Sequence, residues 1–138
     1  MPIPFRIRQI NTRQFAMFPD LLVNGEGVTV TSEFSFGVNN EVNDISCVTK
    51  LTYSQNDKLL LTIEVICFFA IGEEGRRHFV DSGRVEVTFL RYLATIATGT
   101  VRGIIHTKTE NTALNPVVLP PLNLMEVIKE DFVFKNVG

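Results

Sequence analysis

Apolar and polar residues alternate along two segments near the start of the chain, and this pattern predicts β-strands. Between residues 28 and 38, five of the six even positions are apolar, and the odd positions are polar or glycine. A period of two is typical of an antiparallel strand with one buried and one solvated face. Residues 3–10 alternate in the same way, with Phe5 and Ile7 on one face and arginines on the other.

Two longer apolar runs, 45–53 and 59–71, predict a β-hairpin. In both runs the apolar side chains occupy odd positions, so the numbers of paired residues must sum to an even value. The connecting loop must then contain an odd number of residues, and a three-residue loop at 56–58 meets this requirement. The same register places Cys47 directly opposite Cys67.

Residues 84–108 are the only long segment with helical periodicity, and they carry two apolar stripes. A helix on the surface of a monomer needs only one such stripe. We therefore expect one stripe to pack on the chain's own sheet and the other to contact the same helix in a second copy. The stripe assigned to this oligomer interface comprises Leu90, Ala94, Ala97, Val101 and Ile104. The other stripe comprises Val85, Phe89, Tyr92, Ile96, Thr100 and Gly103.

Two further segments complete the predicted architecture. Residues 72–80 are polar and contain two glycines, so we expect a loop there. After a connection at 109–118, Pro120 and Pro121 fix an extended backbone that leads into a short helix starting near Asn123. The apolar face of that helix comprises Leu124, Val127 and Ile128.

The composition is that of a globular domain. With 138 residues, 45% of them hydrophobic and 20% charged, residues 1–138 are expected to form one domain with a packed core. The net charge of −2, with both signs interspersed, argues against a nucleic-acid-binding protein. No apolar run reaches the roughly 20 residues of a membrane span, and the first residues contain no signal-peptide core, so we expect a cytoplasmic protein. The eleven phenylalanines belong either to the core or to a phenylalanine-lined binding surface.

The residues capable of chemistry form no recognisable catalytic or metal site. Directly paired strand residues have Cβ atoms about 4.5–5.5 Å apart, whereas a relaxed disulfide needs about 3.8 Å. Cys47 and Cys67 are therefore expected to be reduced thiols in the core. The two histidines lie near no cysteine or carboxylate cluster, which argues against a zinc site. The pair Glu73–Glu74 beside two arginines is interpreted as a solvated charge cluster, and we expect neither an enzyme nor a cofactor.

Several short motifs occur in a distinctive order along the chain. The first strand contains FRIRQI, alternating strands lead to the sequence LTIEV, and the long helix has Tyr92 ahead of Val101-Arg102-Gly103. The sequence Pro121-Leu122-Asn123-Leu124 follows this helix. Each motif is short, but their order, which covers most of the chain, resembles the SecB family of export chaperones.

The resemblance implies an α+β fold, in which a four-stranded antiparallel sheet carries the long helix and a short C-terminal helix. It also implies dimers that pair through their long helices into a homotetramer. Members of this family bind unfolded or precursor polypeptides in apolar grooves and keep them competent for protein export without ATP. Phe and Leu side chains suit this task because burial, at about 25 cal/mol per Å², is not directional. By position, the polypeptide-binding residues are Phe15, Phe18, Leu21, Leu22, Phe34, Phe36, Leu119, Leu122, Leu124, Val127 and Ile128.

Glu64 is a carboxylate in the middle of an apolar strand. Either its face of the sheet is solvated, or the carboxylate contacts a partner protein. The resemblance implies a partner, because Glu64 matches one of the acidic positions through which SecB proteins bind the SecA motor. Gln14 and Phe18 are at the corresponding positions of the first strand, and neither is acidic. The alternatives are a SecB-like chaperone dedicated to an antitoxin or another specific client, a module that binds a small apolar ligand, and a structural subunit.

Overall fold

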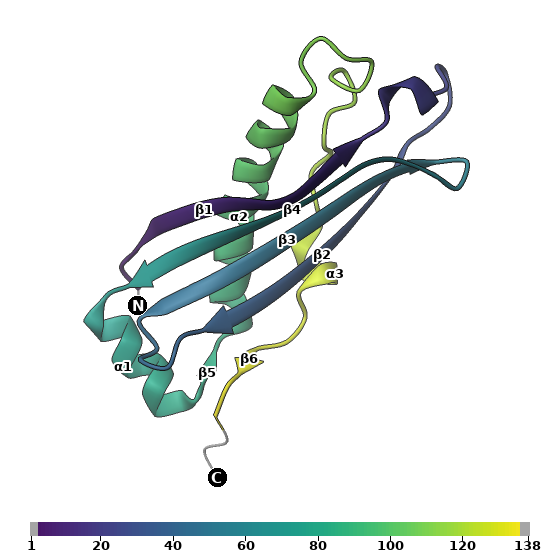
Figure 1. Cartoon of the computed structure of the whole chain (residues 1–138). Coiled ribbons are helices and arrows are strands. Elements are labelled where there is room, and N and C mark those ends of the chain that lie inside the picture. Colours follow the sequence, from purple (N-terminus) through teal and green to yellow (C-terminus); the bar gives the residue numbers. More distant parts are fainter. Residues whose placement is uncertain (1–2, 136–138) are drawn as a thin grey trace.

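Four antiparallel strands form the main sheet, in the order β1-β4-β3-β2 (Figure 1). The computed structural model describes residues 3–135. The strands of the sheet are β1 (Phe5–Met17), β2 (Thr29–Val38), β3 (Asp44–Gln55) and β4 (Lys58–Ile71). The fold is therefore α+β with a four-stranded antiparallel sheet, as expected, and its two edges are β1 and β2.

Helix α2 (Val87–Lys108) crosses one face of the sheet and lies behind the strands in Figure 1. Side chains alternate along β3 and β4, and the odd positions, from Leu61 onward in β4, are buried because they face this helix. The other face of the sheet, turned toward the viewer in Figure 1, is not covered by any helix of residues 3–135. Core side chains without exposed surface include Ile45, Leu51, Ile63, Phe69 and Leu93.

The β3–β4 hairpin has the predicted register along most of its length. Cys47 pairs directly with Cys67, which confirms the prediction from the apolar positions. The predicted three-residue loop is wrong, because the turn contains only Asn56 and Asp57, with φ of 52° and 62°. Positive φ at both central residues is the type I′ geometry, which matches the twist of antiparallel strands. An extra residue in β4, Leu60, forms a bulge and restores the predicted register.

The loop predicted at residues 72–80 is wrong, because Glu73–Ser82 form helix α1. Glutamates in the first turn interact favourably with the positive end of the helix dipole, and Arg77, one turn later, lies 3.4 Å from the Glu73 carboxylate. Phe79 is fully buried, and Gly83 ends the helix with a φ of 70° that favours glycine. The helix was missed because only one large side chain, Phe79, is buried along its ten residues.

Two corrections apply to the long helix. It begins at Val87 and not at residue 84, because Arg84–Val85 form the short strand β5, which pairs with β6 (Phe132–Val133). The stripe assigned to an oligomer interface faces the chain's own sheet, since the alanines at 94 and 97 let the helix backbone approach the strands. Tyr92, on the other stripe, is 59% exposed, so the part of that stripe within α2 forms the outward face, whereas Val85, in β5, is fully buried. The four misassigned residues with at most 1% exposure are Leu90, Ala94, Ala97 and Val101, and Ile104 is half-buried.

The C-terminal segment runs along the free edge of β2 (Figure 1). It contains the one-turn helix α3 (Leu124–Val127) and β6, and a short 3-10 turn, η1 (Pro19–Leu21), follows β1 at the other end of the sheet. The predicted apolar face of α3 is only partly buried, because Val127 is 41% exposed. Within residues 3–135, no helix combines the length and the hydropathy needed to cross a membrane.

Candidate functional site

A groove lies between the free edge of β2 and the C-terminal segment. Its volume is about 550 Å³, and its walls are residues 34–36 and 127–132, with Leu90 of α2 also lining it. Phe34 and Phe36 face it because even positions of β2 point to the helix side of the sheet. The structure therefore brings together four of the predicted polypeptide-binding residues, and we call this cavity the β2 groove. These four are Phe34, Phe36, Val127 and Ile128.

A second cavity, of about 470 Å³, follows the same edge of the sheet beyond β2. Phe132 lines the β2 groove and Phe134 lines the second cavity, and their ring centroids are 6.3 Å apart, so the two cavities are neighbours. Sequence reasoning missed both phenylalanines, although their alternation around Val133 was a usable signal. The residues lining the second cavity are Val38, Asn39, Asn40, Glu41, Val42, Arg76, Val80, Phe134 and Lys135.

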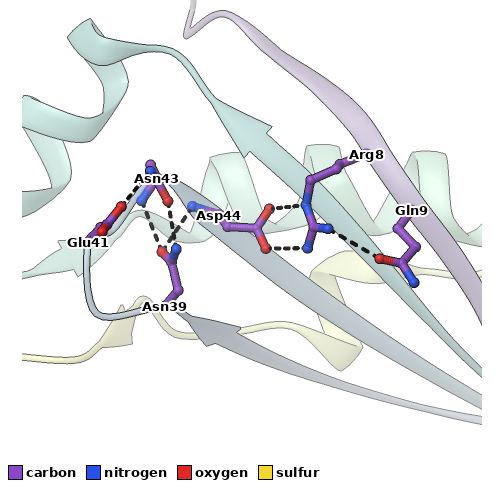
Figure 2. Close-up of polar contacts among 6 residues, drawn as sticks. All are labelled: Arg8, Gln9, Asn39, Glu41, Asn43 and Asp44. Carbon is purple, nitrogen blue, oxygen red and sulfur yellow. Dashed lines mark hydrogen bonds and ion pairs between the residues drawn. The ribbon is translucent and has the colours of Figure 1, made fainter.

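A polar network fixes the loop at the end of the second cavity (Figure 2). The Asn39 side-chain oxygen accepts hydrogen bonds from the backbone N–H groups of Asn43 and Asp44, at 3.0 and 3.1 Å. Arg8 of β1 donates two hydrogen bonds to the Asp44 carboxylate, at 2.8 and 3.1 Å. Arg76 of α1 donates to the backbone carbonyl of Glu41 at 2.7 Å, so the loop is held from two sides.

The C-terminal wall of the β2 groove is held by polar groups of α2. Arg91 donates from Nε to the carbonyl of Ile128 at 2.9 Å. The Asp131 carboxylate accepts a hydrogen bond from the backbone N–H of Val87 at 2.8 Å and lies 3.4 Å from Arg84. Asp131 thereby satisfies one of the free N–H groups at the start of the helix. These contacts join residues about 40 positions apart, and no sequence pattern pointed to them.

A separate group of exposed apolar residues lies beside the hairpin turn. Phe18, Leu21 and Val23 are 44%, 42% and 46% exposed, and we call them the apolar rim. In Figure 1, η1 lies near the β3–β4 turn, whereas β6 lies toward the opposite end of the sheet. The structure therefore does not place the predicted residues Phe18 and Leu21 in the β2 groove. Leu22, beside them, is half-buried.

The remaining predicted binding residues contribute little free surface. Leu119 is only 3% exposed and belongs to the core, so its assignment to a polypeptide-binding surface is wrong. Phe15, Leu122 and Leu124 are half-buried and pack against the core. Phe15 also lies under the ammonium group of Lys108, which is 5.0 Å from the centre of its ring.

A third cavity, of about 590 Å³, opens beside the outward face of α2. The ring of Phe5 is edge-on to those of Phe89 and Tyr92, with centroids 5.6 Å apart in both pairs. A contact between His78 Nε2 and the Glu86 carboxylate supplies the polar part of the wall. Aromatic rings from β1 and α2 thus meet at a site that sequence reasoning did not identify.

Glu64 lies on the solvated face of the sheet, where its charge is balanced. Its carboxylate is 3.4 Å from the guanidinium of Arg13, and its side chain is 25% exposed. Lys50 and Gln14 are its direct partners on the neighbouring strands. The face is therefore solvated, and Glu64 is not part of an uncompensated acidic patch.

The buried polar groups of the core are unsuited to catalysis. Burial raises the pKa of Cys47 to about 12 and also raises that of Cys67, so both stay thiols near neutral pH and are poor nucleophiles. Burial raises the pKa of Tyr53 as well, while the nearby charge of Arg102 acts in the opposite direction. Among residues 3–135, no three His, Cys, Asp or Glu side chains gather into a metal-binding group.

Comparison with known proteins gives one line of evidence, which concerns the fold. No protein-family model matches the sequence, and no curated protein matches it. Among solved structures, the chain is similar to the Mycobacterium tuberculosis Rv1957 SecB-like chaperone, in a complex with a ChAD peptide from the Rv1956 HigA1 antitoxin. The match has a TM-score of 0.52 and 20% sequence identity, and it covers 86% of this chain and 90% of the other. This chain therefore has a SecB-like fold.

Proposed function

We propose that this chain of SecB-like fold is a chaperone that binds unfolded polypeptides without ATP. The observation that carries the proposal is the β2 groove, which follows an edge strand of the sheet and has Phe34 and Phe36 on one wall, while Lys129, Glu130 and Asp131 add charged groups on the other. An extended polypeptide can add a strand to such an edge and place alternate side chains in the groove. Each fully buried Leu or Phe of the client contributes about 1.5–3 kcal/mol, whatever its neighbours are.

A client-dedicated chaperone is the form of this function that the sheet surface favours over a general export factor. Docking on the SecA motor through Glu64 requires a free acidic face, and here Arg13 and Lys50 flank this carboxylate. Asp44, on the same face, is bound by Arg8. The SecB-like chaperone of similar fold was solved with an antitoxin peptide, which supports a polypeptide client for this chain as well.

Self-association into a dimer of dimers is part of the proposal. Ile7 and Ile10 of β1 pair with buried residues of β4, so they point to the helix side of the sheet, yet they are 38% and 43% exposed. Tyr92 adds a large exposed ring on the outward face of α2. Apolar surface of this kind on an unpaired strand edge usually marks a protein interface.

The test is the refolding of a reduced, unfolded model protein in the presence of the chain. We expect wild type to slow refolding at stoichiometric ratios and Phe36→Asp to bind the client at least about tenfold more weakly, because the change removes an aromatic ring from the groove wall and puts a charge in its place. Thr31→Asp, on the solvated face of the same strand, is the matched control and should act like wild type. Unchanged refolding with excess wild-type chain contradicts the proposal.

A small apolar ligand is the second candidate, and the cavity beside Phe5, Phe89 and Tyr92 is the observation that favours it. A cavity of this size whose lining includes three aromatic rings suits a compact apolar molecule. Native mass spectrometry of the purified chain distinguishes the two functions. A bound small molecule, together with no affinity for unfolded protein, supports this candidate and opposes the chaperone.

A further inference from the structure

The side chain of Gln55, at the end of β3, holds the loop that follows the apolar rim. Gln55 is only 4% exposed. Its Oε1 accepts a hydrogen bond from the N–H of Val23 at 2.7 Å. Its Nε2 donates to the carbonyl of Val23 at 2.9 Å and to the carbonyl of Glu26 at 3.1 Å. One buried amide therefore satisfies three backbone groups of a segment about 30 residues earlier in the chain.

The two hydrogen bonds at Val23 resemble those between paired β-strands, except that the side-chain amide of Gln55 takes the place of the partner strand's backbone. A peptide unit presents one N–H and one C=O, and the Gln55 amide offers the same two functions to the N–H and C=O of Val23. The loop has little stiffness of its own, because it contains Gly25, which has a φ of 85°, and Gly27. Asn56 adds a contact from its side-chain nitrogen to the carboxylate of Glu26.

We propose that Gln55 is a positioning residue for client binding, which fixes the loop so that the apolar rim projects from the end of the sheet. The inference rests on the proposed chaperone function and adds a second contact region to the β2 groove. Val23 is held at its backbone by Gln55, while its side chain remains 46% exposed. An apolar side chain is thus kept in solvent on a fixed backbone, next to Leu21 and at the end of the sheet that carries Phe18.

Pre-ordering of the rim determines its affinity for a client. A client that binds a mobile loop must also order its backbone, and ordering even one residue costs enough to weaken binding by about tenfold. The amide is required because it both accepts and donates. A carboxylate at position 55 only accepts, so it faces the carbonyls of Val23 and Glu26 without a proton between them. Protonation of that carboxylate restores one O–H donor.

The experiment compares full-length wild type, Gln55→Glu and Gln9→Glu. Gln9 is exposed on β1, so Gln9→Glu makes the same chemical change away from the loop. The probe is a fluorescently labelled, carboxymethylated unfolded protein, and its Kd is measured between about pH 5 and pH 8. We expect Gln55→Glu to bind about tenfold more weakly than wild type at pH 8 and to approach wild type at the acid end. Gln9→Glu should follow wild type throughout.

Loop order is measured independently by cleavage after Glu26 with a glutamate-specific protease. We expect faster cleavage in Gln55→Glu than in Gln9→Glu at pH 8. A loosened loop with an unchanged Kd, or an unchanged cleavage rate, overturns the inference. If wild type does not bind the probe, the chaperone proposal fails instead, and cleavage still shows whether Gln55 orders the loop. If Gln55→Glu does not fold, Gln55→Met removes the same hydrogen bonds and should bind weakly at every pH.

Discussion

The buried thiol of Cys47 makes the stability of the protein depend on alkaline pH. Burial raises its pKa from 9.0 to about 12, so the folded state favours the protonated thiol more strongly than the unfolded state does. The resulting stabilisation is complete below pH 9 and is lost as the pH rises toward 12. The substitution Cys47→Ala, which removes the sulfhydryl group, abolishes this titration and leaves the other ionisable groups in place.

The size of this loss of stability follows from the difference between the folded and unfolded pKa values of the thiol. Each pH unit between the unfolded and folded pKa values costs about 1.4 kcal/mol, so wild type should lose about 2 kcal/mol through this thiol between pH 8 and pH 10.5. All other ionisable groups are the same in both proteins. The quantity to compare is therefore the change in unfolding free energy between the two pH values, in wild type and in Cys47→Ala.

The assay is urea unfolding followed by far-UV circular dichroism, at one fixed chain concentration and with a reductant present. We expect the unfolding free energy to fall more steeply with pH in wild type than in Cys47→Ala, by about 2 kcal/mol over this interval. Equal pH dependence in the two proteins would refute the assignment of Cys47 to a dry core opposite Cys67.

Three further outcomes follow from the packing. Leu93→Ala removes a fully buried side chain and should lower the unfolding free energy by about 2–5 kcal/mol, whereas exposed Thr95→Ala should change it by less than about 0.5 kcal/mol in the same urea titration. Asp131→Ala removes the acceptor at the start of α2 and should cost about 1 kcal/mol, with weaker client binding in the fluorescence assay because the groove wall is released. Tyr92→Asp should reduce the mass measured by light scattering, and an unchanged mass would exclude this residue from the proposed interface.

The strands were predictable because each has one solvated face. Alternation showed which residues of 28–38 point inward. Because the apolar residues of both hairpin strands occupy odd positions, paired residue numbers had to sum to an even value, and this placed Cys47 opposite Cys67. The same rule could not predict the length of the turn, because a two-residue turn with a bulge at Leu60 gives the same register as a three-residue loop. The exposure of Leu59 and the burial of Leu60 follow from that bulge.

The orientation of the long helix could not be deduced from apolarity. Both stripes are apolar, so hydrophobicity alone does not say which one faces the sheet. The structure places Ala94 and Ala97 against the strands, where small side chains permit close approach, and leaves Tyr92 outside. Side-chain size, and not the number of apolar residues, would have given the right assignment.

The two walls of the β2 groove differed in how far sequence could predict them. Phe34 and Phe36 followed from alternation within one strand, but Phe132 lies about 100 residues later and reaches them only through the pairing of β6 with β5. That pairing, and the hydrogen bond from Arg91 to the Ile128 carbonyl, depend on the tertiary position of α2. Local patterns carry no information about such contacts.

The positions of β1 and β2 make association and client binding compatible. The sheet order puts these strands at opposite edges, with β4 and β3 between them. The exposed residues proposed for self-association, Ile7, Ile10 and Tyr92, belong to β1 and to the outward face of α2. The β2 groove lies at the other edge, against the C-terminal segment. A copy bound along β1 therefore leaves the β2 edge unpaired, so each subunit of the proposed oligomer keeps its own groove, and the number of grooves rises with the number of subunits.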